Sequence, residues 1–446
     1  YTEPIGKNKQ LEFNYNISSN VNNSGRATNG YNKVTDNYDI AVPNLSNIFE
    51  NTFNANRFTL NYRVQNAKYN FSVGSGLQVG DLVSKNISTN INLKQHFVNL
   101  FPSANFRYDF TKSKNLRMFY NGRTSQPSAD QLQPVIDNSN PLLIRTGNPN
   151  LKQQFSHSFR FLFNSFDIFT QKIIFATLSG SFIENDIQNS TTISGGGVQT
   201  IKPVNLSGTY NINGFFNYGF PIKKPKSNLN LTFGSIFSNQ KFNSTLFQFL
   251  DNNSTFDPNP TFNDGLISND VEYKFNDIYL AARYRIKIGK FTMTPGFSMH
   301  SYGNKNIQLG NEYADDFFRI MPDFETRVQF KNSESLTFRY NMSNQFTDVT
   351  KLAKGLVLNN YDSIQFGNPE LQNALSHNLS LIYSSFNLFN YTNVFGRIAY
   401  ANNIDQIRNI TFFENQQIFL ILIDFYIITS YNNMMLTYLN KSFYGN

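Results

Sequence analysis

The chain has 446 residues, a formal net charge of +8 and no cysteine. Only 15% of its residues are charged, whereas 16% are aromatic, with 46 Phe and 24 Tyr. This length fits one large barrel or two or three soluble domains. Scattered cations do not indicate a nucleic-acid partner, and the absence of cysteine excludes disulfides and thiolate metal sites.

The composition is unusual for a soluble enzyme, because so many strand aromatics need an apolar surface to pack on. No apolar run reaches the roughly 18 residues of a transmembrane helix, and the nearest, 418–428, contains Asp424. This criterion does not apply to a membrane β-barrel, since only every second residue of its strands faces lipid. The region after Tyr1 shows no signal peptide, so we expect the sequence to be a fragment of a longer protein.

Apolar and polar residues alternate with a period of two through most of the chain, and helical periodicity is almost absent. The ranges 11–18, 58–64 and 278–288 are clear cases. In the last of these, one face is continuously apolar and the other is cationic. In a membrane barrel the cationic face would line the lumen, so we predict Arg63, Arg283 and Arg285 to face the lumen.

Short and long links alternate along the predicted strands, as in outer-membrane barrels with tight turns at one end and long loops at the other. The short links are predicted at 65–68, 111–115, 165–172, 223–227, 288–290, 331–335 and 384–393. The long links are predicted at 20–56, 121–154, 184–206, 240–270 and 341–376.

Two predicted strands, 90–110 and 312–330, are unusually tall and contain Pro102 and Pro322. Proline cannot donate a hydrogen bond within a sheet, so we predict a bulge or bend at each position. The alternative is that each proline ends one strand and begins another.

The sequence Gly-Asn-Pro occurs twice, 220 residues apart, and predicts a turn between a long loop and a strand in each copy. The assigned residues are Gly147, Asn148, Pro149, Leu151 and His157, and Gly367, Asn368, Pro369, Leu371 and His377. The same offset relates many other positions. It predicts two related units, 1–217 and 218–446, each with about eight strands, and a tail at 417–446 that departs from the pattern.

The run from Leu132 to Lys152, together with the opening Tyr-Thr-Glu-Pro-Ile-Gly-Lys at 1–7, resembles the barrel part of outer-membrane proteins of the TonB-dependent receptor type, in their Bacteroidetes-like branch. The resemblance covers about residues 1–415. It implies a 22-stranded barrel that imports bulky ligands with energy relayed by TonB, with a plug domain as a further partner. No plug or TonB-contacting segment lies in this sequence.

No catalytic motif stands out: the sequence has no nucleophile elbow, no phosphate-binding glycine loop and no zinc-type histidine pair. We therefore predict no enzyme, no cofactor and no metal. His157 and His377 are expected to form hydrogen bonds where a loop meets a strand, whereas His96 and His300 are interpreted as ordinary strand residues.

These features predict an antiparallel transmembrane β-barrel of about sixteen strands, in contact with lipid in the outer membrane of a Gram-negative bacterium. The predicted function is TonB-dependent uptake of a bulky ligand captured by the long loops at 121–154 and 341–376. The alternative is a barrel that displays loops for adhesion or partner binding without transport; a plug domain encoded upstream would favour the receptor. A third hypothesis is a secreted soluble all-β binding protein, which would be extracted without detergent.

Overall fold

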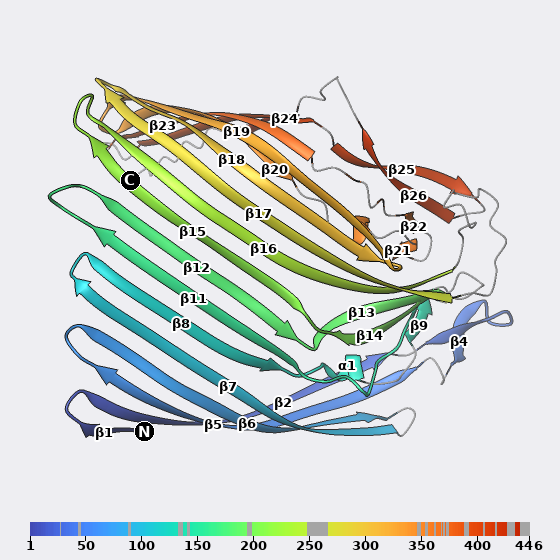
Figure 1. Cartoon of the computed structure of the whole chain (residues 1–446). Helices are drawn as coiled ribbons and strands as arrows, with labels where there is room; N and C mark the ends of the chain where they lie inside the picture. Colours follow the sequence, from blue (N-terminus) through green and yellow to red (C-terminus); the bar gives the residue numbers. More distant parts are fainter. Residues whose placement is uncertain are drawn as a thin grey trace.

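In the computed structural model, the protein is one long antiparallel sheet that curls around a central space (Figure 1). The described residues are 1–26, 28–42, 46–87, 91–132, 137–140, 143–193, 199–247, 266–345, 349–352, 356–360, 363–366, 368, 371, 374–387, 392–404, 406–414, 417–425 and 433–437. None of the helices in this part has the length and apolarity to cross a membrane.

Neighbours along the chain are also neighbours in the wall, apart from the short strands of the long loops. The wall strands are, in order, β1 (Thr2–Gly6), β2 (Lys9–Arg26), β5 (Asn47–Gln65), β6 (Tyr69–Asn86), β7 (Ile91–Thr111), β8 (Lys114–Ser125), β11 (Gln154–Phe166), β12 (Ile173–Glu184), β15 (Thr209–Ile222), β16 (Ser227–Phe247), β17 (Leu266–Ile288), β18 (Phe291–Gln308), β19 (Asn311–Lys331), β20 (Glu334–Gln345), β23 (Ala374–Asn387), β24 (Thr392–Ile404) and β27 (Asn433–Thr437). The predicted all-β antiparallel wall of about sixteen strands is confirmed.

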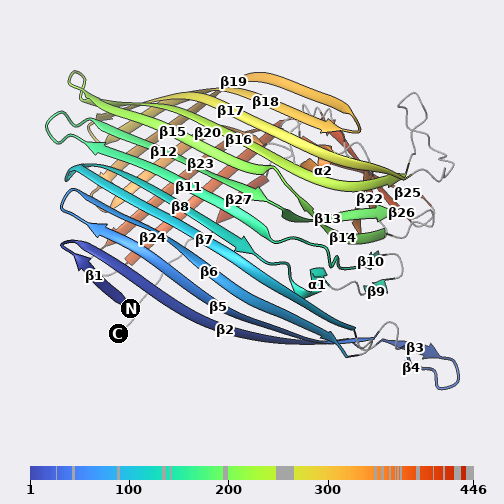
Figure 2. The same ribbon diagram turned by 60° about the horizontal axis from the view of Figure 1, so that its bottom comes forward.

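The sheet curls so that β23 and β24 lie behind β7 to β12 (Figure 2). Within the described residues, β1 pairs with β2 alone and β27 pairs with β24 alone, so the ladder is not closed between these two strands. Many wall strands have 18 to 23 residues, as in β2, β6 and β17. A tilted strand needs only about 9–11 residues to cross a bilayer, so the wall is taller than a membrane is thick.

Alternation gives the wall two chemically different faces. The outer face carries large apolar side chains that are widely exposed, such as Phe58, Leu60 and Leu280 with 44%, 52% and 52% exposure. The inner face carries the polar and charged residues between them, including Arg63 and Arg283. Such an apolar surface is stable in contact with hydrocarbon and costly in contact with water.

The links predicted to be short lie at one end of the wall, for example between β5 and β6, β7 and β8, and β19 and β20. The prediction that short and long links alternate is wrong in two places. Short links also join β6 to β7 and β18 to β19, at the opposite end of the wall. Leu309 and Gly310 form the second of these turns with φ of 50° and 74°. Two consecutive positive φ values give the hairpin turn whose twist matches paired strands.

Both tall strands are continuous, but the predicted bulge at each proline is wrong. Pro102 stays in register with Ser75 on β6, and Pro322 with Phe297 on β18. On the other side, pairing with the following strand stops one residue later, at Ser103 and Asp323. Proline lacks an N–H, so each proline lies where its strand no longer needs to donate in that direction.

The long loops carry short strands and two helices of their own: β3 (Asn29–Asn32), β4 (Asn37–Ala41), α1 (Ala129–Leu132), β9 (Asp137–Asn140), β10 (Leu143–Arg145), β13 (Asp186–Ile193), β14 (Gln199–Leu206), α2 (Val349–Leu352), β21 (Leu356–Asn360), β22 (Ser363–Phe366), β25 (Gln406–Glu414) and β26 (Gln417–Phe425). β10 pairs in parallel with β14, and β22 pairs in parallel with β26. The tail at 417–446 departs from the repeat in sequence. As far as β26, its strand pairing nevertheless matches that of the first half of the chain.

A charge on the outer face should prevent the sheet from residing in lipid. We expect Leu280→Arg to destabilise the protein folded in lipid vesicles by about 2–4 kcal/mol, because the guanidinium would enter hydrocarbon. Ala281→Arg, one residue along on the inner face, is the matched control and should cost much less. Equilibrium denaturation of both variants in vesicles measures the difference, and equal losses would contradict the assignment of the two faces.

Candidate functional site

The loop between β8 and β11 begins with a capped helical turn. Ser128 and Gln131 form reciprocal hydrogen bonds, in which the Gln131 amide donates to Ser128 Oγ (3.2 Å) and the Ser128 amide donates to Gln131 Oε1 (2.9 Å). This capping box satisfies two backbone donors and fixes the start of α1. Leu132, the last residue of α1, is thereby directed into a fully buried position.

The buried leucines of this loop pack on the inner face of the wall. Leu132 and Leu151 form a cluster with Leu82 of β6 and Phe97 of β7. Gln95, on the same face of β7, donates from Nε2 to the Pro149 carbonyl at 3.0 Å. On β7 the polar residues Gln95 and Asn99 lie on either side of Phe97 on this face, so the apolar patch is a defined seat for the loop. The loop therefore folds into the lumen.

Asn148 connects the three segments of this loop region. Its amide donates to the Gln131 carbonyl of α1 (2.6 Å), and its Nδ2 donates to the Pro203 carbonyl of β14 (2.9 Å). Its Oδ1 accepts the amide of Asn150 at 3.1 Å, which closes the turn around Pro149. An asparagine suits this position because its short side chain offers a donor and an acceptor together.

The second long loop is held at the same kind of seat. Leu352 at the end of α2 and Leu371 pack with Val271 and Tyr273 of β17. The Leu352 carbonyl accepts from Nε2 of Gln308 at 2.8 Å, and the Asn368 amide donates to Lys351 at 2.8 Å, as Asn148 does to Gln131. Gly367 and Pro369, assigned to the turn from sequence, lie outside the described residues.

His157 and His377 each have a tyrosine partner on the neighbouring strand. Tyr120 Oη lies 3.0 Å from His157 Nδ1, and Tyr340 Oη lies 2.9 Å from His377 Nδ1. Both pairs lie on the outer face, close to the end of the wall that carries the long loops. Aromatic and amphipathic side chains at this level match the girdle where a barrel meets the lipid headgroups.

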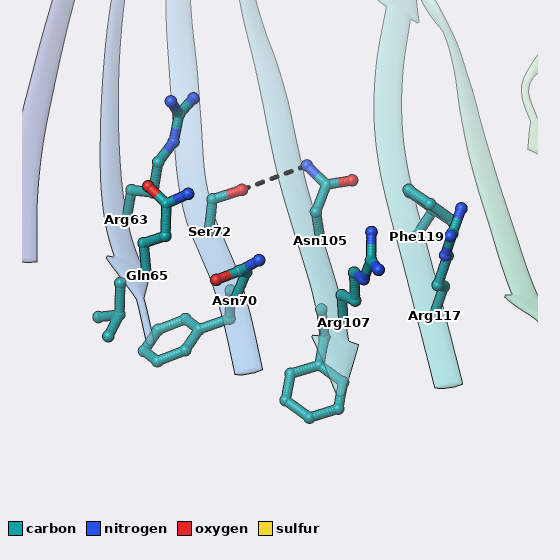
Figure 3. Close-up of a pocket in the computed structure, with 11 residues that line it drawn as sticks. Arg63, Gln65, Asn70, Ser72, Asn105, Arg107, Arg117 and Phe119 are labelled. Atoms are coloured by element: carbon teal, nitrogen blue, oxygen red, sulfur yellow. Dashed lines mark hydrogen bonds between the residues drawn. The ribbon is translucent and has the colours of Figure 1, made fainter. Parts of the chain in front are cut away.

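A pocket of about 320 Å³ lies on the inner face near the short turns (Figure 3). Three of its lining residues are arginines from three strands of the wall: Arg63 on β5, and Arg107 and Arg117 on the adjacent strands β7 and β8. Arg63 Nη2 lies 3.2 Å from Glu12 Oε2, and Arg107 Nε lies 3.0 Å from Asp109. The Nε atom of Arg117 is buried and, within the described residues, has no hydrogen-bond partner.

Sequence reasoning missed Arg107 and Arg117. Both residues belong to stretches with the same period-two alternation that identified Arg63. The register between the strands then shows that the polar side chains of 105–109 and 117–119 lie on the same face as those of 63–65. In the second half, Arg283 and Arg285 lie on the same face of β17 as Asp277. Arg283 Nε is 3.0 Å from Asp323 Oδ2, so its charge is partly compensated.

Metal binding has no support in the described part of the chain, where no group of three or more potential ligands from His, Asp and Glu comes together.

A model of the Outer membrane protein beta-barrel family matches residues 1–255. This match covers more than half of the sequence, so the chain belongs to that family and is a β-barrel protein of the Gram-negative outer membrane. The predicted family, fold class and location are confirmed. No curated protein matches the sequence.

Several solved outer-membrane proteins are similar to the chain. The transporter YddB from Escherichia coli is 11% identical over 83% of this chain and 50% of its own, with a TM-score of 0.40. A mutant of the ferric enterobactin receptor PfeA from Pseudomonas aeruginosa is 10% identical over 95% and 59%, with a TM-score of 0.46. The FrpB iron transporter from Neisseria meningitidis is 10% identical over 94% and 57%, with a TM-score of 0.43. The chain thus spans 50–59% of the length of these proteins.

Truncating either buried leucine of the first loop should release the loop from the wall. Leu132→Ala and Leu151→Ala each remove a buried side chain, a change that typically costs about 2–5 kcal/mol. We expect faster hydrogen exchange at the amides of 128–132 and 146–151, while exchange in β6 and β7 stays slow. Lys152→Ala, at an exposed position beside Leu151, is the control. Unchanged exchange in both leucine variants would show that the seat does not hold the loop.

Proposed function

We propose that the chain forms the wall of an outer-membrane uptake receptor that captures a bulky ligand and passes it through the lumen in a TonB-dependent step. The observation that carries this proposal is the inward fold of the loop between β8 and β11, with Leu132 and Leu151 seated on the inner face. A loop held there narrows the entrance and faces whatever enters it. Plug and TonB are the partners that this function requires.

The inner wall favours anionic or polar ligands. Arg63, Arg107 and Arg117 line one pocket, whereas their described carboxylate partners are Glu12 and Asp109. Arginine presents a planar set of donors that suits carboxylate and phosphate groups. A solute captured by the loops would therefore meet a second polar contact near the short turns.

The alternative, a barrel that displays loops for adhesion, is favoured by the β3–β4 hairpin. This hairpin pairs only with itself among the described residues and carries exposed Val34 and Tyr38. An adhesive barrel needs loops that project outward, whereas the two loops with leucine seats fold inward. We also propose that residues 1–217 and 218–446 are related units, which the recurrent loop topology and the paired leucine seats support.

Uptake is tested in the native organism by deleting the gene and supplying single bulky nutrients at limiting concentration. We expect growth to fail on at least one nutrient, and a strain lacking TonB to fail on the same one. Mass spectrometry of small molecules that copurify with the detergent-extracted protein identifies candidates for this test. Normal growth on every nutrient, combined with reduced attachment of the deletion strain to surfaces, would support the display barrel instead.

The pocket predicts a measurable preference for anions. Arg117→Gln removes a cation whose Nε lacks a partner among the described residues, so we expect about a tenfold weaker binding of citrate, as for the loss of one charged hydrogen bond. Lys172→Gln, an exposed cation near the same end of the wall, is the control. Calorimetry on the refolded chain measures both; equal affinities of the two variants would exclude Arg117 from anion binding.

A further inference from the structure

We propose that Ser298, His300 and Asp277 form a hydrolytic site on the inner wall, which cleaves carboxylic esters that enter the lumen. The site lies about halfway along β17 and β18, apart from the arginine pocket and next to the second leucine seat, since Tyr302 stacks on Phe275 of that seat. It does not depend on uptake being the function of the barrel.

The three side chains have the connectivity of a nucleophile, a base and an orienting carboxylate. His300 Nε2 is 2.9 Å from Ser298 Oγ, and His300 Nδ1 is 2.9 and 3.1 Å from the two carboxylate oxygens of Asp277. A carboxylate can only accept from a ring N–H, so Nδ1 carries the proton. Nε2 then has a free lone pair toward the serine hydroxyl, which is the tautomer that a general base requires.

Strand geometry brings the three residues together without any special loop. Ser298 and His300 are two apart on β18 and so share the inner face. Asp277 pairs with Tyr302 on the neighbouring strand, which places it diagonally next to His300. At an offset of 220 residues, the first half of the chain has Arg57, Gln78 and Gly80 at the matching sequence positions.

Two tyrosine rings stack on the imidazole of His300 and hold it in place. Tyr279 stacks on His300 with ring centroids 4.9 Å apart at 19°, and Tyr302 stacks with centroids 5.2 Å apart at 13°. Tyr279 in turn lies over Gly234, where an added Cβ would collide with the tyrosine ring. With side-chain exposures of only 12% for His300 and 7% for Asp277, the pair is largely shielded from solvent.

Ser298 has a small neighbour on one side and a cation diagonally across on the other. Its register partner on β17 is Ala281, and its register partner on β19 is the buried Met321. Backbone amides of the wall are engaged in the ladder, and side chains must therefore stabilise negative charge. Arg319, the register partner of His300 on β19, has a buried Nε without a hydrogen-bond partner among the described residues. It can supply that stabilisation.

The proposed reaction is a two-step acyl transfer to water. Ser298 Oγ bonds to the carbonyl carbon of the ester while His300 Nε2 takes the hydroxyl proton. The bond from that carbon to the alcohol oxygen breaks, and Nε2 returns the proton to the departing alcohol. Water then attacks the acyl-serine with Nε2 as base, which releases the acid and restores the hydroxyl.

His96 and Asp81 show what distinguishes the site. Their side chains lie 2.8 Å apart, but the residues two away from His96 on its strand are Lys94 and Val98, and both partners are widely exposed. Neither of those neighbours is a nucleophile within reach of the second ring nitrogen. A substitution of His96 therefore controls for any effect of a histidine–aspartate pair that has no neighbouring serine.

The test uses the full chain refolded in detergent, with p-nitrophenyl butyrate as substrate and a fluorophosphonate as covalent probe. We expect hydrolysis to fall about 100-fold or more in Ser298→Ala, and the probe to modify Ser298 in the unaltered chain but not in His300→Gln. Asp277→Asn should also lower the rate while preserving the shape of the site. Ser179→Ala, whose hydroxyl bonds to Asn213, and His96→Gln should leave the rate unchanged.

Circular dichroism and resistance to protease establish that each variant is folded. A folded, unaltered chain that neither hydrolyses the ester faster than Ser298→Ala nor forms an adduct at Ser298 would overturn the proposal. So would an adduct spread evenly over other serines. If Ser298→Ala does not fold, the rate of Asp277→Asn and the adduct in the unaltered chain decide the matter.

Discussion

The structure depends on one constraint, which is that a chain in hydrocarbon must pair its own backbone N–H and C=O groups. An antiparallel sheet of tall strands meets this demand where the described wall strands from β2 to β24 pair on both sides, which β7 and β19 do from Ser103 and Asp323 onward. Side chains are then free to differ between the faces. Phe58, Leu60 and Leu280 can stay exposed outside because lipid covers them, while the inner face can carry polar and charged side chains.

The loops face the opposite problem. A loop that enters the lumen must satisfy its polar backbone there and still gain enough from packing to offset the entropy of being ordered. Leu132 and Leu151 supply the packing, and Ser128, Gln131 and Asn148 supply the hydrogen bonds. The second loop repeats the solution with Leu352 and Leu371. Two apolar seats on a polar wall are thus what gives each loop a defined place.

The wall could be predicted from sequence because its signal is local: a period of two, turn residues and strand length are all visible in one stretch. The positions of Arg107 and Arg117 beside Arg63 could not be predicted, because they depend on register between strands. The two prolines illustrate the same limit. Their missing N–H was recognised, but whether it causes a bulge or lies where pairing ends depends on the register with the next strand, which the sequence of 90–110 does not contain.

His300 shows how far register changes the interpretation of a residue. In sequence it is a lone histidine in a strand; in the sheet, its two ring nitrogens face Asp277 from β17 and Ser298 from its own strand. Side chains on the inner face neither contact lipid nor take part in backbone pairing. The inner face can therefore hold such an arrangement with little loss of stability. Burying a histidine and a carboxylate is nevertheless unfavourable unless each is paired. Because Asp277 and His300 satisfy each other and stacking holds the ring, the remaining nitrogen is left to act on the serine hydroxyl.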